Sequence, residues 1–338
     1  MEDAAGVCDR AGLERLAGRR VLVTGASGLI GSNLLACLAE LRRRGVAFEA
    51  WGTGRGEFPD HVEALAAEGG IGLLRVDLAS PGAGYDLPDA DLVLHCAGYG
   101  QPGKFLADPI ATILLNTAAT AALVRRLPAG GRLLFASTSE VYSGLESEAH
   151  REDDIGTTTP YHPRAPYIEG KRCGEAICAA ALEQGVQARS ARVALAYGPG
   201  TRLDDARVLN TFIQRALTEG RIEMRDSGQA MRTYCYVADT IELLWRILLD
   251  GKQPVYNVGG RSNLSVAELA TLIGRLTATE VIVPPAEASL GGAPATVRLD
   301  VSRVEAEFGK SSYTGLEDGL RRTIEWQRQL YGPIGGRT

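Results

Sequence analysis

Two residues four positions apart, Tyr167 and Lys171, could together carry acid–base chemistry. A helix predicted to begin after Pro166 puts both side chains on one face, because residues four apart are neighbours on a helix. An ammonium close to a phenol is expected to lower the phenol's pKa from its usual value of about 10. The pair therefore predicts a tyrosine that works as a general base near neutral pH.

A second polar cluster precedes this pair. The segment from Leu134 is typical of a buried strand that runs into Ser137-Thr138-Ser139-Glu140-Val141-Tyr142. Its hydroxyls and carboxylate would lie at the carboxyl end of the strand, where open α/β sheets bind ligands. The alternative is a loop whose Ser and Thr side chains bond only to their own backbone.

A glycine-rich segment, Thr24-Gly25-Ala26-Ser27-Gly28-Leu29-Ile30-Gly31, follows the first apolar run. Its three glycines permit a tight turn, a close approach of the backbone to a pyrophosphate, and close packing of a helix on a strand. Because a predicted strand precedes it and a predicted helix follows, the segment predicts a dinucleotide-binding site.

The elements that must position these groups alternate between short aliphatic runs and helical stretches, which favours parallel strands joined by crossover helices. The predicted fold is α/β, a Rossmann-type doubly wound parallel sheet. Strands are predicted at Arg20–Thr24, up to Val76, and at Leu92–His95, Arg132–Ala136 and Ala188–Val193, with helices beginning near Gly28, Pro109 and Pro166.

After Gly198-Pro199 the pattern becomes irregular and predicts a smaller substrate-binding lobe. The predicted organisation is an amino-terminal extension (1–18), a dinucleotide-binding Rossmann domain (19–198), and a mainly substrate-binding lobe (199–338). The lobe is predicted to contain helices at Val208–Thr218, Asp239–Leu249, Val266–Leu276 and Leu316–Leu330, and strands at Pro254–Val258 and Glu280–Val283.

The composition excludes several classes of protein. Hydrophobic residues make up 45% and charged residues 23% of 338 residues, as in ordinary globular proteins. A formal net charge of -5 offers no basic footprint for nucleic acid. No apolar run approaches a membrane span and residues 1–18 do not resemble a secretion signal, so we expect a cytoplasmic protein without a membrane partner. The scattered cysteines and histidines predict no metal site.

The spacing of the glycine segment is similar to that of the extended short-chain dehydrogenase/reductases. The resemblance continues in Val76-Asp77-Leu78, where the family's carboxylate binds the adenine amino group, and in His95-Cys96-Ala97-Gly98, which in the family passes under the nicotinamide ribose. The end of the second strand, Trp51-Gly52-Thr53-Gly54-Arg55, lacks the Asp that usually binds the ribose hydroxyls, and Arg55 could pair with a 2′-phosphate. Both NAD and NADP therefore stay open. The predicted cofactor contacts are Gly25, Ser27, Gly28, Leu29, Ile30, Gly31, Thr53, Arg55, Asp77, Leu78, Ala97, Tyr167 and Lys171.

Within that family the chain most resembles the nucleotide-sugar branch, and among its members the UDP-glucuronate decarboxylases. The resemblance lies in residues 137–142, in Pro-Arg-Ala-Pro-Tyr-Ile-Glu-Gly-Lys-Arg at 163–172, and in Met-Arg-Thr-Tyr at 231–234. It implies a nucleotide-sugar substrate, with Thr138 donating to the sugar O4. The candidate catalytic residues that it implies are Thr138, Ser139, Glu140, Tyr167, Lys171 and Arg232.

Three positions depart from the decarboxylase pattern: Leu195 replaces an Asn, Gly200 an Arg, and Phe105 a substrate-facing Tyr. Several reactions therefore stay open. Tyr-assisted oxidation at C4 to a 4-keto sugar could lead to decarboxylation or to epimerisation. A 4-ketoreductase that consumes NADPH is an alternative, and so is a non-catalytic dinucleotide sensor, although such a sensor would be expected to lose Tyr167 or Lys171. The family usually dimerises through two helices, here near Leu114–Leu127 and Tyr167–Leu182, so we expect a homodimer.

Overall fold

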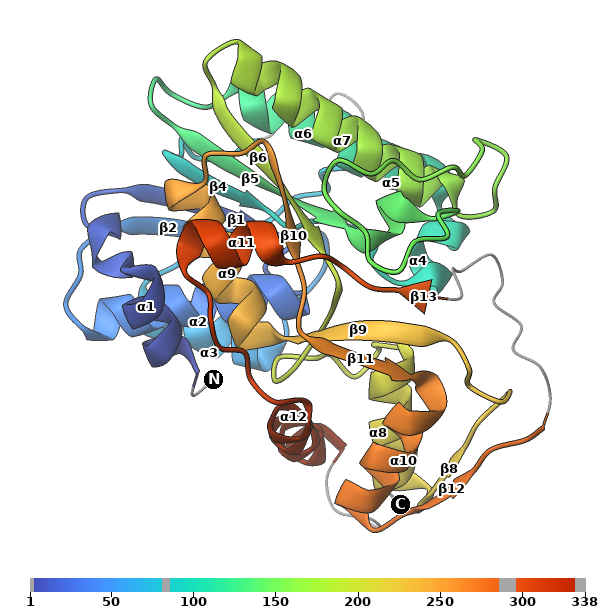
Figure 1. Ribbon diagram of the computed structural model, residues 1–338. Coiled ribbons are helices and arrows are strands. Elements are labelled where there is room, and N and C mark those ends of the chain that lie inside the picture. Colours follow the sequence, from blue (N-terminus) through green and yellow to red (C-terminus); the bar gives the residue numbers. More distant parts are fainter. Residues whose placement is uncertain (1–2, 81–85, 286–295, 332–338) are drawn as a thin grey trace.

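A parallel sheet of seven strands forms the centre of the computed structural model, which describes residues 3–80, 86–285 and 296–331 (Figure 1). Across the sheet the order is β10-β6-β5-β4-β1-β2-β3, and every pairing is parallel. The strands are β1 (Arg20–Thr24), β2 (Glu49–Gly54), β3 (Gly72–Arg75), β4 (Leu92–His95), β5 (Arg132–Thr138), β6 (Gln187–Val193) and β10 (Val255–Val258). The predicted doubly wound fold is confirmed.

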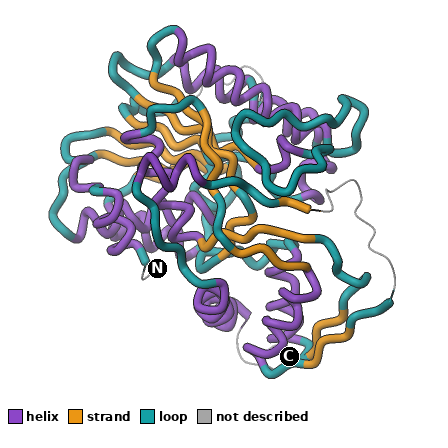
Figure 2. Tube along the Cα trace, viewed as in Figure 1, coloured by secondary structure: helices purple, strands orange, loops and turns teal. Residues whose placement is uncertain are grey.

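Helices cover both faces of this sheet, as Figure 2 shows by element type. Side chains of β1 alternate between the two layers: Val21 and Val23 join one core cluster and Leu22 the other, as the two-residue period of a strand requires. One face carries α2 (Leu29–Arg43), α3 (Asp60–Gly69) and α9 (Val237–Asp250). The other face carries α5 (Pro109–Asn116), α6 (Ala118–Arg125) and α7 (Ala165–Glu183), next to the short α4 (Pro102–Ala107).

A smaller group of elements lies beyond the carboxyl ends of these strands (Figure 1). Its centre is β9 (Met231–Tyr236), which pairs with β7 (Leu195–Tyr197), β11 (Ser262–Ser265) and β13 (Thr296–Val297). A second pair joins β8 (Arg221–Glu223) to β12 (Glu280–Ile282). The helices of this part are α8 (Val208–Thr218), α10 (Val266–Thr277) and α12 (Leu316–Tyr331), and α11 (Ser302–Phe308) packs near β10.

The predicted strands at Arg20–Thr24 and Leu92–His95 are confirmed at both ends, but other expectations need correction. The helix expected over Leu114–Leu127 is broken at Thr117, where α5 ends and α6 begins. Strand β9 was not predicted. Both α9 and β10 follow residue 199 yet belong to the layers of the seven-stranded sheet, so the sheet crosses the predicted domain boundary.

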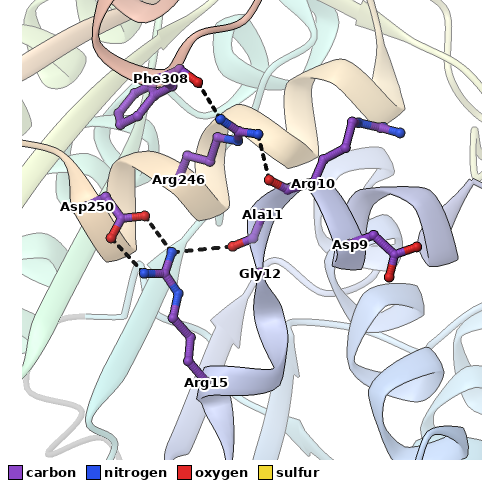
Figure 3. A pocket seen from close by; sticks show the side chains of 8 residues that line it. All are labelled: Asp9, Arg10, Ala11, Gly12, Arg15, Arg246, Asp250 and Phe308. Carbon is purple, nitrogen blue, oxygen red and sulfur yellow. Dashed lines mark hydrogen bonds and ion pairs between the residues drawn. The ribbon is translucent and has the colours of Figure 1, made fainter.

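The amino-terminal residues form α1 (Ala4–Ala11) and the short helix η1 (Leu13–Leu16), which pack against α2 and α9. Beside them lies a cavity of about 390 Å³ (Figure 3). Its charged side chains are engaged within the protein: Arg15 pairs with Asp250, and Arg246 donates to backbone carbonyl oxygens. Arg132, at the start of β5, donates to the carbonyl of Leu249 near the end of α9. The cavity therefore lies at the amino-terminal edge of the sheet, opposite the predicted site.

Within the three described ranges, no helix is both long enough and apolar enough to cross a lipid bilayer.

Candidate active site

The glycine segment forms the turn between β1 and α2 that was predicted. Gly25 has a positive φ of 72°, and a Cβ atom there would lie 2.7 Å from the backbone nitrogen of Ala97. A Cβ at Gly31 would press into the Gly25 carbonyl oxygen and lie 2.7 Å from Ala26 Cα. Only glycine fits at these two positions, because the loop packs directly on the neighbouring backbone.

The amino end of α2 suits an anion. Gly28 is the N-cap residue, no side chain caps the helix, and its first turn has no acidic residue. The first N–H groups of a helix and its dipole attract negative charge. Ser27 lies in the turn itself, and Leu29 and Ile30 are the first two residues of α2. The residues present therefore fit the pyrophosphate of a dinucleotide, held by the backbone of this segment.

Two buried polar side chains support the loop from below. The Oγ1 atom of Thr24 lies 2.7 Å from Nδ1 of His95 and accepts a hydrogen bond from the Ala97 backbone N–H at 3.2 Å. Burial lowers the pKa of His95 to about 3, with a further contribution from Lys171. His95 is therefore a neutral structural residue that ties the carboxyl ends of β1 and β4 together.

The other predicted cofactor residues lie around this turn. Thr53 is buried and its carbonyl accepts a hydrogen bond from Ala26, so it supports the glycine loop through its backbone. Leu78 is buried, whereas Asp77 is exposed and accepts from the Ala79 N–H. Arg55 is exposed and donates to the Tyr99 hydroxyl at 2.6 Å, with its guanidinium 5.2 Å from the centre of that ring.

Tyr167 and Lys171 lie on the buried face of α7, as predicted, beside the carboxyl end of β5. The side chain of Thr138, the last residue of β5, lies close enough to the Tyr167 hydroxyl to favour a lower pKa for it. Lys171 Nζ donates to the Ala136 carbonyl at 2.6 Å and lies 3.3 Å from the place where a Cβ of Gly98 would be. Lys171 thus connects α7 to the end of β5 and to the segment that follows β4.

The expectation that Lys171 lowers the pKa of Tyr167 is wrong for the protein without ligands. Lys171 Nζ is 5.9 Å from the tyrosine ring centre and points to a backbone carbonyl. Burial, followed by the negative charge of Glu140, raises the pKa of Tyr167 to about 12; Thr138, Arg164 and Arg207 oppose this. Burial lowers the pKa of Lys171 to about 8. Desolvation outweighs the attraction that helical spacing predicts.

Two predicted site residues, Glu140 and Arg232, both interact with a third residue, Arg164. Arg164, the N-cap residue of α7, donates to both carboxylate oxygens of Glu140, with Nε 2.8 Å from Oε2. Arg232 on β9 is near enough for the charges of Glu140 and Arg164 to affect its pKa, which burial lowers. Ser139 is buried at the start of η2 (Ser139–Tyr142). Because Arg164 donates to both of its oxygens, the carboxylate of Glu140 acts as a hydrogen-bond acceptor.

Phe105 of α4 covers Tyr167. Its ring stacks on that of Tyr167, with centroids 4.7 Å apart and planes 6° from parallel. Neighbouring contacts hold α4 in place: Lys104 pairs with Asp204 at 2.9 Å, and the Gln101 side chain accepts from the Ala206 N–H. A phenylalanine here provides an apolar surface and no hydroxyl.

A buried polar network supports the end of β5 from the other side. Ser137 donates to Glu175, which forms an ion pair with Arg192 at 2.8 Å. Arg192 also donates to the Tyr142 hydroxyl, which in turn donates to Asn257 on β10. Glu175 lies one helical turn after Lys171 and favours its charged form. The network fixes the elements that carry the site, and it does not include the Tyr167 hydroxyl.

Three residues near Tyr167 were not predicted as site residues: Arg164, Arg207 and, as a packing partner, Phe105. Arg164 belongs to the segment 163–172 that carries the family resemblance, but nothing in the sequence indicated its pairing with Glu140. Arg207 pairs with Asp205 just before α8 and lowers the pKa of Tyr167 from a distant part of the chain. Contacts between segments so far apart cannot be predicted from a pattern of neighbouring residues in the sequence. In the described part of the chain, no group of three or more His, Cys, Asp or Glu side chains is arranged to hold a metal ion.

In a comparison with protein families, the matched part of the chain contains the residues described above. The model of the NAD dependent epimerase/dehydratase family matches residues 21–259, well over half of the sequence. This range includes the glycine turn, Tyr167, Lys171 and Arg232.

Individual relatives carry out different reactions. UDP-glucuronic acid decarboxylase 1 of Danio rerio is 31% identical over 91% of this chain and 72% of its own length. A dTDP-4-dehydro-6-deoxy-D-allose reductase of Streptomyces sp is also 31% identical, over 93% of this chain and 98% of its own. The solved structure of MoeE5 in complex with UDP-glucuronic acid and NAD has a TM-score of 0.74 and 28% identity, over 92% of this chain and 99% of that one.

Proposed function

The chain belongs to the NAD dependent epimerase/dehydratase family, and from this premise we propose that it oxidises a nucleotide-activated sugar at C4 to a 4-keto intermediate. The observation that carries the proposal is that Tyr167, buried on the helix that also holds Lys171, lies beside the buried Thr138 at the end of β5. A hydroxyl of the sugar at this point would have a proton acceptor and a hydrogen-bond donor at once.

Each residue has a distinct part in this first step. Tyr167, as phenolate, takes the proton of the C4 hydroxyl, and Thr138 orients that hydroxyl through its own hydrogen bond. Lys171 supplies positive charge beside the segment that follows β4. A bound NAD would supply the acceptor for the hydride that leaves C4. The stacked ring of Phe105 excludes water from one face of the tyrosine.

The ketone then activates the neighbouring C5. If C5 bears a carboxylate, the 4-keto sugar is a β-keto acid: the bond between C5 and the carboxylate breaks, carbon dioxide leaves, and its electron pair forms an enolate that takes a proton at C5. Return of the hydride to C4 restores the hydroxyl. If C5 keeps its substituents, return of the hydride to the opposite face of C4 gives the C4 epimer, whereas loss of the C5 proton to form the enolate and return of a proton to the opposite face gives the C5 epimer. Both routes are neutral in net redox change.

Decarboxylation of a uronic acid is the route that we favour. Arg232 is a half-buried cation close enough to Glu140 and Arg164 for their charges to affect its pKa, and Arg207 adds a further positive charge near Tyr167. A substrate carboxylate or diphosphate would be attracted to such a site. The likeness to UDP-glucuronic acid decarboxylase 1 supports this route.

A 4-ketoreductase that consumes NADPH is the second candidate. The observation in its favour is the exposed Arg55 at the end of β2, which could release Tyr99 and pair with a 2′-phosphate. The likeness to a dTDP-4-dehydro sugar reductase supports it as well.

The experiment that separates these routes follows cofactor and sugar together. Purified protein is incubated with UDP-glucuronate, UDP-glucose and dTDP-4-keto sugars, and mass spectrometry identifies the products. We expect UDP-glucuronate to lose carbon dioxide without net consumption of cofactor. Stoichiometric loss of NADPH with a 4-keto sugar would establish the reductase instead. No change in any nucleotide sugar would contradict the proposal.

We also propose a homodimer formed through α5 and α7. These two helices pack together, and α5 leaves Ile110 65% and Ile113 36% exposed on its outer side. Apolar side chains of this size favour burial against a second copy. Light scattering at micromolar concentration should give twice the mass of the chain, and a monomer would contradict the proposal.

A further inference from the structure

Arg164 is held rigidly beside the candidate active site. Only 7% of the residue is exposed, and its backbone carbonyl accepts hydrogen bonds from the N–H groups of Tyr167 and Ile168 in the first turn of α7. Its side chain donates to both oxygens of Glu140, which is the two-pronged geometry that fits a guanidinium to a carboxylate. The position of Arg164 is thus fixed from both its backbone and its side chain.

The same guanidinium also contacts the aromatic stack. Its Cζ atom lies 5.0 Å from the ring centre of Phe105, and the Phe105 ring is stacked on Tyr167. A cation over an aromatic ring at this distance is attractive. Arg164 therefore touches Glu140 directly and Tyr167 through one intervening ring.

The charges that face Tyr167 come from several elements. Glu140 at the start of η2 is the one that disfavours a phenolate, whereas Arg164 at the start of α7 and Arg207 before α8 favour it. Lys171 on α7 lies 5.9 Å from the ring centre, and Arg232 on β9 interacts with Glu140 and Arg164. Without Arg164, less positive charge would offset the carboxylate of Glu140, and the phenolate form of Tyr167 would be less stable.

We propose that Arg164 is a positioning residue for Tyr167: it neutralises the Glu140 carboxylate and, through Phe105, holds the plane of the tyrosine ring. The inference rests on the proposed role of Tyr167 as the proton acceptor at C4. Glu140 and Arg164 act as one neutral unit, so that the site keeps a carboxylate near the substrate without suppressing the base. The positive charge of Arg164 favours loss of the Tyr167 proton, and its forked guanidinium holds Phe105, and through it the Tyr167 ring, in place.

A direct titration of Tyr167 tests this unit. The protein, loaded with NAD, is labelled with [13Cζ]tyrosine, and the Tyr167 resonance is assigned by its loss in Tyr167→Phe. The pH titration of this resonance is compared among wild type, Arg164→Met, Arg164→Lys, Glu140→Gln and the double variant Glu140→Gln/Arg164→Met. Arg275→Met, which removes a surface ion pair with Glu317, is the matched control.

The expected shifts have opposite signs. Arg164→Met should raise the pKa of Tyr167 by about one unit, and Glu140→Gln should lower it by a similar amount, because a charge within a few ångströms shifts a pKa by about 1–3 units. The double variant should titrate close to wild type. Arg164→Lys keeps the charge and should also stay close to wild type, as should Arg275→Met.

Where the sugar is turned over, the acidic limb of the pH–rate profile should move by the same amounts. The proposal is overturned if Arg164→Met titrates like wild type, or if Glu140→Gln fails to lower the pKa. If Arg164→Met does not fold, Glu140→Gln and Arg164→Lys still decide the question. The resonance reports on Tyr167 without turnover, so absence of any nucleotide-sugar reaction would contradict the proposed function and not the role of Arg164.

Discussion

The dinucleotide end of the site is built from backbone, and the catalytic end from buried side chains. At Gly25 and Gly31 there is no space for a Cβ atom, and no side chain caps the helix that follows. Around Tyr167, by contrast, a carboxylate, an arginine and an aromatic ring are held in fixed contact, and a second arginine adds its charge. The first region should therefore respond to added volume, and the second to the loss of a charge or a proton at constant volume.

The largest effect should come from the smallest change in shape. Tyr167→Phe removes one oxygen and keeps the ring that stacks on Phe105. Folding and dinucleotide binding should stay near wild type, while turnover falls by roughly 10² to 10⁴-fold, the usual contribution of a general acid–base group. Steady-state kinetics and a dinucleotide titration check both parts. Turnover above about a tenth of wild type, well outside that range, would contradict the role of Tyr167.

At the dinucleotide end, the addition of one methyl group should destabilise the protein and prevent dinucleotide binding. Gly31→Ala places a Cβ atom against the Gly25 carbonyl and 2.7 Å from Ala26 Cα. We expect a loss of about 1–3 kcal/mol in the free energy of unfolding, with loss of dinucleotide binding. Gly28→Ala is the control, since the nearest atom to its Cβ is 3.4 Å away. Its unfolding free energy should change by less than about 0.5 kcal/mol, as chemical denaturation would measure. Equal losses for both would contradict the packing argument.

Two buried lysines should respond in opposite directions. Burial lowers the pKa of Lys171 to about 8, from a model-peptide value near 10.4, so its charge destabilises the folded protein at pH 7. Lys171→Met should raise the free energy of unfolding there by about 1–2 kcal/mol, while turnover falls. Lys310 pairs with Asp239 at 2.7 Å and Glu242 at 2.9 Å, so Lys310→Met should cost about 3–5 kcal/mol.

The pH dependence gives this prediction its sign. Between the two pKa values of Lys171 the unfolded chain binds a proton that the folded protein has lost, so the stability of wild type rises with pH over that range. The advantage of Lys171→Met should therefore shrink as the pH increases above about 8. Denaturation of the dinucleotide-free proteins at several pH values measures it. A Lys171→Met variant that is less stable than wild type at pH 7 would contradict the assigned pKa.

The smallest effect is expected at the opposite edge of the sheet. Arg15 lines the cavity beside α1 and pairs with Asp250, but both side chains are almost half exposed. Arg15→Ala should lower the free energy of unfolding by no more than about 1 kcal/mol, as for other surface ion pairs, and leave turnover unchanged. A large fall in turnover would give this cavity a part in function.

The same contrast explains what the sequence could predict. Strands β1 and β4, the glycine turn and the Tyr167–Lys171 face depend on local spacing, and the structure has them where the sequence predicted. The pairing of Glu140 with Arg164 and the stacking of Phe105 on Tyr167 depend on which loops meet after folding. Strand β9 was missed because its partners, β7, β11 and β13, come from separate parts of the chain. The pKa of Tyr167 was misjudged because burial is not visible in helical spacing.

The most direct test of the account follows one turnover by absorbance. Protein loaded with NAD is mixed with a nucleotide sugar that it converts, carrying hydrogen or deuterium at C4. The account predicts a transient near-ultraviolet absorbance of reduced nicotinamide that forms more slowly from the deuterated sugar and is lost in Tyr167→Phe. A transient of equal rate for both sugars, or product formation without any transient, would contradict oxidation at C4 with Tyr167 as the base.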